Sequence, residues 1–192
     1  MRAANTYQNK TVAKAVQHTK DLTYIALAVG LISVCSWISV PMVVPFTLQT
    51  FAVFATIALL GGKRGTIATT CYILLGLTGA PVFSNMTGGV GVLAGLTGGY
   101  VIGFVFVGLI YWLFETLLPK KLWWQITALV LGLLVCYAFG TAWFMLVYGQ
   151  KFGAISLASA LTMCVVPFIP VDILKLVCSI MLTKAIEKRI KL

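Results

Sequence analysis

Two residues of opposite charge, Asp172 and Lys175, lie three positions apart in the otherwise uncharged stretch 167–179. On a helix, residues three apart are neighbours on one face, so this spacing predicts that the carboxylate and the ammonium group contact each other. An ionisable group inside a membrane span costs about 3 kcal/mol unless it is paired or faces a cavity. The two residues are therefore candidates for binding a polar or charged ligand. The alternative is a structural ion pair that neutralises itself inside a helical bundle.

The composition predicts that this stretch belongs to a membrane protein. Of the 192 residues, 60% are hydrophobic and 9% are charged, and the mean hydropathy is +1.03, whereas soluble domains are about 45–50% apolar and about 25% charged. The net charge of +10 does not indicate nucleic-acid binding, because the cations lie between apolar segments rather than on one face. We expect a single membrane domain over residues 1–192, with a basic lead at 1–20 and a helical bundle over 22–190.

Six apolar segments are expected to cross the membrane as helices. They are residues 22–40, 48–60, 65–79, a segment that contains the glycine-rich stretch 91–103 and ends at 118, 125–148, and 170–184. The predicted fold class is therefore an all-α integral membrane protein with six transmembrane helices. No cleavable signal peptide is expected, because residues 1–20 are polar and basic and the first apolar run is too long for one.

The lysines and arginines predict the orientation of these helices. Four precede the first span, two lie between the second and third, two between the fourth and fifth, and four follow the sixth. Thus 12 of the 14 cations lie on alternate connections, while Lys151 lies on the other side and Lys175 within a span. The positive-inside rule then predicts that both termini are cytoplasmic and that the protein is a multi-pass protein of the cell membrane.

Two irregular segments on the predicted outer side supply further candidate ligand contacts. Pro41 and Pro45 disfavour a continuous helix, and a loop at membrane depth must be covered by protein or line a cavity. Thr47 and Gln49 in this segment are candidates for contacting a ligand or for capping the next helix. In the second segment, Asn85 carries an amide that can both donate and accept hydrogen bonds to a ligand, and a local turn is the alternative.

Glycines recur at every fourth position, at 91, 95, 99 and 103. In a continuous helix they would form one face without side chains over three turns. Such a face suits close helix packing, or it forms a flat wall for a ring-shaped ligand.

Ala26 and Gly30 form a small-residue pair near the start of the first span. A pair of this spacing lets another helix approach closely. Packing within the protein and docking of a partner subunit both remain open.

The usual signatures of an enzyme are missing from the sequence. The single histidine, His18, lies in the polar lead, and the five cysteines have neither C-x-x-C nor metal-ligand spacing. We therefore expect no catalytic residues and no metal site. No G-x-x-x-x-G-K-[ST] motif is present, so we expect no ATP hydrolysis by this chain itself.

Four ordered motifs resemble those of the BioY family: VPFTLQTF at 44–51, GAPVF at 79–83, GGVGVLAGLTGGY at 88–100 and PVDILK at 170–175. BioY proteins are the biotin-binding substrate-specific (S) components of energy-coupling factor (ECF) transporters. The resemblance implies the ECF S-component fold and capture of biotin from the extracellular side. It implies uptake together with a transmembrane coupling subunit and two cytoplasmic ATPases, which alone use ATP. No cofactor is expected, and biotin is the transported ligand.

The resemblance also implies roles for the polar candidates. Biotin has a flat bicycle, a ureido group with one strong acceptor and two donors, and a carboxylate tail. Lys175 can neutralise an anion, Asp172 can accept from the ureido N–H groups, and Asn85 can do either.

The remaining candidates would enclose the bicycle. Gly95, Gly99 and Tyr100 are expected to form its wall, and Thr47 and Gln49 to close a lid. The family's S components dock through an A-x-x-x-A motif on the first helix, which Ala26 and Gly30 match with glycine in place of the second alanine.

Two other functions remain possible from the sequence. One is an S component for another small vitamin on the same architecture, which would bind a related acid but no biotin. The other is a self-sufficient proton-coupled carrier that uses Asp172 as its relay. An intramembrane enzyme is disfavoured, because the sequence has no paired carboxylates, metal-ligand cluster or nucleophile–histidine set.

Overall fold

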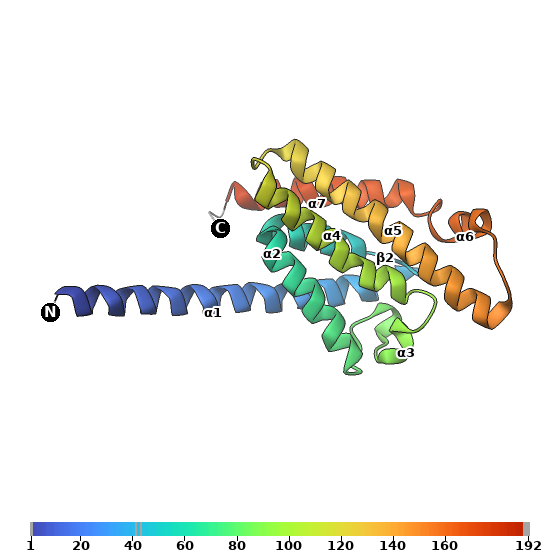
Figure 1. The fold of residues 1–192 in the computed structure, drawn as a ribbon, viewed down its shortest axis with the longest axis horizontal. Helices are drawn as coiled ribbons and strands as arrows, with labels where there is room; N and C mark the ends of the chain where they lie inside the picture. The colour runs from blue at the N-terminus through green and yellow to red at the C-terminus, as the bar shows by residue number, and fades with distance from the viewer. Residues whose placement is uncertain (1, 41, 43, 190–192) are drawn as a thin grey trace.

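The structure is a computed structural model that describes residues 2–40, 42 and 44–189. Nearly all of its regular structure is helical, as the composition predicts (Figure 1). The elements in chain order are α1 (Arg2–Trp37), β1 (Ser39–Val40), β2 (Phe46–Thr47), α2 (Gln49–Leu77), the short 3₁₀ helix η1 (Ser84–Met86), α3 (Val90–Leu93), α4 (Gly98–Leu117), α5 (Leu122–Phe152), α6 (Leu157–Cys164) and α7 (Ile169–Glu187).

Four of the described helices are long and apolar enough to cross a membrane: the Lys14–Trp37 part of α1, and α2, α4 and α5. The pair α6 and α7, which meet at an angle of 46°, makes a fifth candidate. This number differs from the six expected spans because the predicted spans 48–60 and 65–79 form one element, α2.

A break at Gly61 divides α2 into two arms. Gly61 has φ 80° and ψ 165°, a backbone conformation that glycine adopts readily and other residues rarely do. The arms fold back on each other, since a Cβ on Gly65 would lie 2.7 Å from the Cα of Ile57. Glu115 of α4 accepts a hydrogen bond of 2.7 Å from the backbone N–H of Gly62, which begins the second arm. The arms coincide with the two predicted spans.

The lead at 1–20 is not separated from the first span. A single helix, α1, runs from Arg2 to Trp37 and projects beyond the other helices (Figure 1). The sequence has neither proline nor glycine between residues 2 and 29, so nothing in this stretch interrupts a helix. At the point where α1 leaves the bundle, Arg64 forms an ion pair of 3.0 Å with Asp21.

The predicted continuous glycine face over 91–103 is wrong. The chain turns between α3 and α4, and a Cβ on Gly98 would lie 1.7 Å from the carbonyl oxygen of Leu93. Only Gly99 and Gly103 lie on α4 among the four glycines. Both are packed closely against α5, where Gly99 faces the side chain of Trp143. The glycines therefore serve a tight turn and helix packing rather than one flat face.

The buried core is formed by apolar side chains from all the long helices. Its members include Ile32 of α1, Phe54 and Tyr72 of α2, Phe104 of α4, Leu129 of α5 and Leu176 of α7. Large apolar side chains also cover much of the outside, among them Leu27, Leu134, Leu146 and Leu174. An apolar exterior around a packed core is what a bilayer requires of the helices it surrounds.

The segment between α1 and α2 forms a two-stranded antiparallel hairpin, with Ser39 opposite Thr47 and Val40 opposite Phe46. Pro41, one of the two prolines expected to rigidify this loop, lies outside the described residues. The hairpin positions Phe46 and Thr47 beside the start of α2, at the end of the bundle opposite the protruding part of α1 (Figure 1).

Candidate substrate-binding site

A cavity opens at the hairpin end of the bundle, among the hairpin segment, α2, α4, α5 and α7. Its empty space, including the open mouth, is about 690 Å³. Aromatic side chains make much of its wall, namely Phe83, Tyr100, Phe104, Tyr137 and Phe168. Such a lining suits a partly apolar ligand that is held by a few polar contacts.

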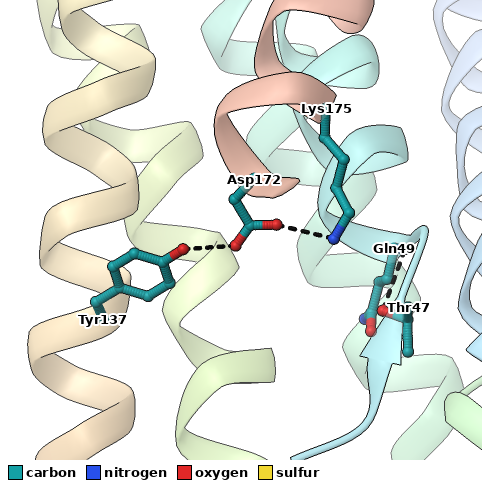
Figure 2. Close-up of polar contacts among 5 residues, drawn as sticks. All are labelled: Thr47, Gln49, Tyr137, Asp172 and Lys175. Carbon is teal, nitrogen blue, oxygen red and sulfur yellow. Dashed lines mark hydrogen bonds and ion pairs between the residues drawn. The ribbon is translucent and has the colours of Figure 1, made fainter. Parts of the chain in front are cut away.

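The predicted contact between Asp172 and Lys175 is present on this wall. The ammonium nitrogen of Lys175 lies 2.8 Å from Oδ1 of Asp172, and the two residues are 5% and 3% exposed (Figure 2). Tyr137 of α5 donates a hydrogen bond of 2.6 Å to Oδ2 of the same carboxylate. Asp172 also lies in the first turn of α7, where the helix dipole favours a negative charge.

Lys175 is positioned by an aromatic ring as well as by the carboxylate. Its ammonium nitrogen lies 4.4 Å from the centroid of the Phe46 ring, a distance at which the ring face attracts a cation. Phe46 in turn stacks on Phe168 at 5.9 Å between centroids. A lysine ammonium carries three donors. Within the described residues, Asp172 is its one hydrogen-bond partner, so two donors are available to a ligand.

Gln49 presents an oxygen to the cavity. Its Nε2 donates a hydrogen bond of 3.0 Å to the hydroxyl of Tyr72, which donates its own proton to the carbonyl of Val82. Because a hydroxyl has only one proton to donate, Tyr72 must accept from the amide nitrogen. The orientation of the amide is therefore fixed, with Oε1 left for the cavity that Gln49 lines.

Thr47 lies on the cavity wall and also orders the start of α2. Its hydroxyl oxygen accepts a hydrogen bond of 3.2 Å from the backbone N–H of Gln49. The capping role considered from the sequence is thus present. A contact with a ligand stays a prediction.

The predicted wall is only partly brought together. Tyr100 lines the cavity, with its hydroxyl 3.0 Å from that of Thr141. Gly95 and Gly99 are not among the lining residues. They contact Trp143 instead, which donates a hydrogen bond of 3.0 Å from its indole nitrogen to the carbonyl of Gly95. Aromatic rings, rather than bare glycine backbone, form the flat surface.

Asn85 also lies outside the cavity lining. It is exposed and adopts the left-handed conformation, with φ 56° and ψ 30°. Its Oδ1 accepts a hydrogen bond of 2.9 Å from the hydroxyl of Ser39, which ties its loop to the hairpin. The neighbouring Ser84 does line the cavity. A direct contact between Asn85 and a ligand is therefore not visible in this arrangement and stays a prediction.

Tyr137 is the site residue that sequence reasoning missed. Its partner, Asp172, is 35 residues away, so no local spacing connects the two. One signal was present in the sequence: Tyr137 falls in the middle of its predicted span, whereas Tyr111 and Tyr148 lie towards span ends, where aromatic belts occur. A hydroxyl at mid-membrane depth needs a polar partner.

The docking candidates Ala26 and Gly30 are both exposed on α1. A Cβ on Gly30 would have nothing within 4 Å. Packing within the described part of this chain therefore does not explain why the pair is small. Docking of a partner stays a prediction.

The described residues contain no group of three or more histidine, cysteine, aspartate or glutamate side chains that could hold a metal ion. The fold and the cavity define a protein of apolar helices long enough to cross a membrane, with a candidate small-molecule site at one end of the bundle. The polar groups of that site have the chemistry to contact charged and hydrogen-bonding groups on a partly apolar ligand.

The BioY family model matches residues 7–192, and the chain belongs to the BioY family. It is 38% identical to the biotin transporter BioY of Thermotoga maritima over 172 residues, which cover 88% of this chain and 96% of that protein. It is 36% identical to the biotin transporter BioY2 of Lactococcus lactis over 164 residues, which cover 83% of this chain and 87% of that protein.

A solved structure has the same arrangement of helices. It is the crystal structure, at 2.1 Å, of the S-component for biotin from an ECF-type ABC transporter. The TM-score is 0.77 at 27% sequence identity, and the match covers 90% of this chain and 93% of that one.

Proposed function

We propose that this chain binds biotin in the cavity described above and serves as the substrate-specific component of an ECF-type transporter. Membership of the BioY family supports this proposal, as do relatives named biotin transporters and a similar structure named as an S-component for biotin. In this chain the proposal depends above all on the buried Asp172–Lys175 pair, which Tyr137 holds at the wall of an aromatic cavity.

The chemistry of biotin fits this cavity. The Asp172 carboxylate can accept from the ureido N–H groups, and the free donors of Lys175 can bind an anionic or carbonyl oxygen. The amide oxygen of Gln49, which lines the cavity, adds an acceptor. The aromatic rings bury the apolar face of the bicycle and supply most of the contact area.

We also propose six membrane crossings with both termini in the cytoplasm. The two arms of α2, divided at Gly61, would each cross the membrane, although α2 counts as a single helix. Three cation-rich connections lie at one end of the bundle, and this supports the orientation. Glu115 contacts both Lys120 and the turn at Gly61, which brings the second and fourth spans' ends together. Lys120 and Lys184 line one groove, which brings the end of the last helix to the same place. The cavity then opens outwards, and the protein resides in the cell membrane.

Transport would require partners. We propose a transmembrane coupling subunit that docks on the Ala26–Gly30 face of α1, together with two cytoplasmic ATPases. The chain has no phosphate-binding loop, so ATP would be hydrolysed by those partners alone. No cofactor is needed for binding, since the ligand contacts come from side chains.

The test is ligand-dependent stabilisation of the purified full chain. A ligand present at 100 times its dissociation constant stabilises the folded state by about 2.7 kcal/mol, so the unfolding temperature should rise with biotin. It should not rise with thiamine, niacin or pantothenate at equal concentration. Stabilisation by one of those vitamins and not by biotin would assign the S component to a different solute.

Reconstitution tests the proposed need for partners. The chain alone in proteoliposomes should bind biotin without accumulating it. Accumulation by the chain alone that an uncoupler collapses would instead support the proton-coupled carrier with Asp172 as the relay.

A further inference from the structure

A second concave site lies at the opposite end of the bundle from the biotin cavity. It is a groove between α5 and α7, to which the first arm of α2 contributes Ala58. Lys120 and Lys184 lie at its polar end together with Gln125, while Leu129 and Ile180 line it farther into the bundle. Leu129 lies two turns beyond the start of α5, so the lining of the groove changes from charged to apolar over about 10 Å.

The two lysines are available to bind an anion. The side chain of Lys120 is 80% exposed, and its one ion pair among the described residues is a long contact of 3.7 Å to Glu115. The Glu115 carboxylate is already engaged by the backbone N–H of Gly62. Lys184 has no ion-pair partner in the described part of the chain. One carboxylate, that of Glu187, also lines the groove and opposes an anionic ligand.

The surroundings place this groove at a membrane surface. Trp123, which is 70% exposed, and Trp124 begin α5 beside the groove, and tryptophan is enriched at the level of lipid headgroups. The flanks of both helices remain apolar and exposed beyond it, at Val130 on α5 and at Val177 and Met181 on α7. A ligand in the groove would therefore meet cations at one end and hydrocarbon at the other.

We propose that this groove binds one anionic phospholipid, with its phosphate between Lys120 and Lys184 and an acyl chain along Ile180 and the exposed side chains of Val177 and Met181 on α7. Basic pockets between transmembrane helices on the cytoplasmic side have the charge to hold anionic headgroups. The apolar half of the groove favours a lipid over a free anion, because free phosphate would leave it empty. The site requires only that this end of the bundle lies at a membrane surface, so its failure would leave biotin binding untouched.

The test measures lipid retained by the purified full chain, by native mass spectrometry after titration with phosphatidylglycerol or phosphatidylcholine of equal chain length. One phosphatidylglycerol should be retained in preference to phosphatidylcholine. The K120Q/K184Q double variant should lose about tenfold or more of that affinity. Lys151→Gln, which removes an exposed cation at the other end of α5, should retain the lipid unchanged. Unchanged biotin binding by each variant establishes that it is folded.

Glu187→Gln provides a variant with the opposite expected sign. Removing the opposing carboxylate should tighten phosphatidylglycerol binding, whereas a merely structural role for these residues predicts no gain. Equal retention of the two lipids, or full retention by the double variant, would overturn the proposal. Displacement of the lipid by millimolar inorganic phosphate would also overturn it, since that result describes an anion site without a lipid preference.

Discussion

The Asp172 carboxylate is held from two helices at once. Lys175, one turn along α7, binds one oxygen and Tyr137 of α5 binds the other. A buried charge with two partners keeps a fixed orientation, and this presents its remaining lone pairs to a ligand. We expect Asp172→Asn to weaken biotin binding at least tenfold, about 1.4 kcal/mol, when the variant is titrated calorimetrically. An affinity equal to that of the parent would remove Asp172 from the site.

The Tyr137 hydroxyl should stabilise the empty protein. Removing a hydrogen bond to a buried charged group costs about 1.5–3 kcal/mol, so Tyr137→Phe should lower the unfolding temperature measured without biotin. Tyr148→Phe on the same helix is the matched control, because its hydroxyl has no hydrogen-bond partner among the described residues and should change little. Equal unfolding temperatures for the two variants would contradict the role given to Tyr137.

For individual residues, the sequence predicts contacts within one helix and misses contacts between helices. Asp172 and Lys175 were predictable as a pair because the α-helical period fixes which residues are neighbours. Tyr137 was not, because its approach to Asp172 depends on how α5 packs beside α7. Gly95 and Gly99 were assigned to the wall by their spacing alone. The bulky side chain of Trp143, which covers them, comes from a different helix.

Among the elements, α2 depends on a single glycine. Gly61 has φ 80°, and a Cβ there would also approach Oε1 of Glu115 to 3.1 Å. A residue other than glycine at this φ and at ψ 165° costs about 1–3 kcal/mol, so Gly61→Ala should lower the thermal stability of the purified protein. Gly149→Ala in α5 is the matched control, because it meets nothing within 4 Å and has no such backbone conformation. A loss of stability no larger than in the control would show that the break tolerates a side chain.

Hydropathy predicts where most of the helices lie. It does not predict the end of a helix where the residues of the following turn are themselves apolar. The segments around α5 and α7 were predicted nearly in full, since a membrane requires long apolar helices. The turn between α3 and α4 was missed because its residues are as apolar as a helix. Glycine is the residue both for close helix packing and for a sharp turn. The structure distinguishes the two roles at Gly98, where a side chain would collide with the backbone of Leu93.

The molecule as a whole presents its binding cavity and its proposed docking face on different elements. Ala26 and Gly30 are exposed positions on α1, which contributes no residue to the lining of the cavity. Gly30→Leu should therefore keep its biotin affinity and lose assembly with the coupling subunit, as measured by co-purification of the co-expressed complex. Ala142→Leu, the same kind of enlargement on an exposed position of α5, should assemble normally. Assembly of Gly30→Leu at the parent level would place the docking face elsewhere.

The orientation of the whole molecule in the membrane is predicted from charge alone, and it stays a prediction. The alternation of cations along the chain needs no knowledge of packing. The structure adds a contact between neighbouring connections, since Glu115 lies beside Lys120 and also engages the start of the second arm of α2. The length of α1 was not predictable from hydropathy, since its first half is polar yet helical.

The most direct measurement is a calorimetric titration of the purified full chain with biotin, beside Lys175→Ala. We predict tight one-to-one binding by the parent chain and at least a tenfold loss in the variant, about 1.4 kcal/mol. The variant must keep the thermal unfolding of a folded protein for the comparison to hold. Unchanged biotin affinity in a folded Lys175→Ala protein would contradict the site, and absence of binding by the folded parent would contradict the proposed function.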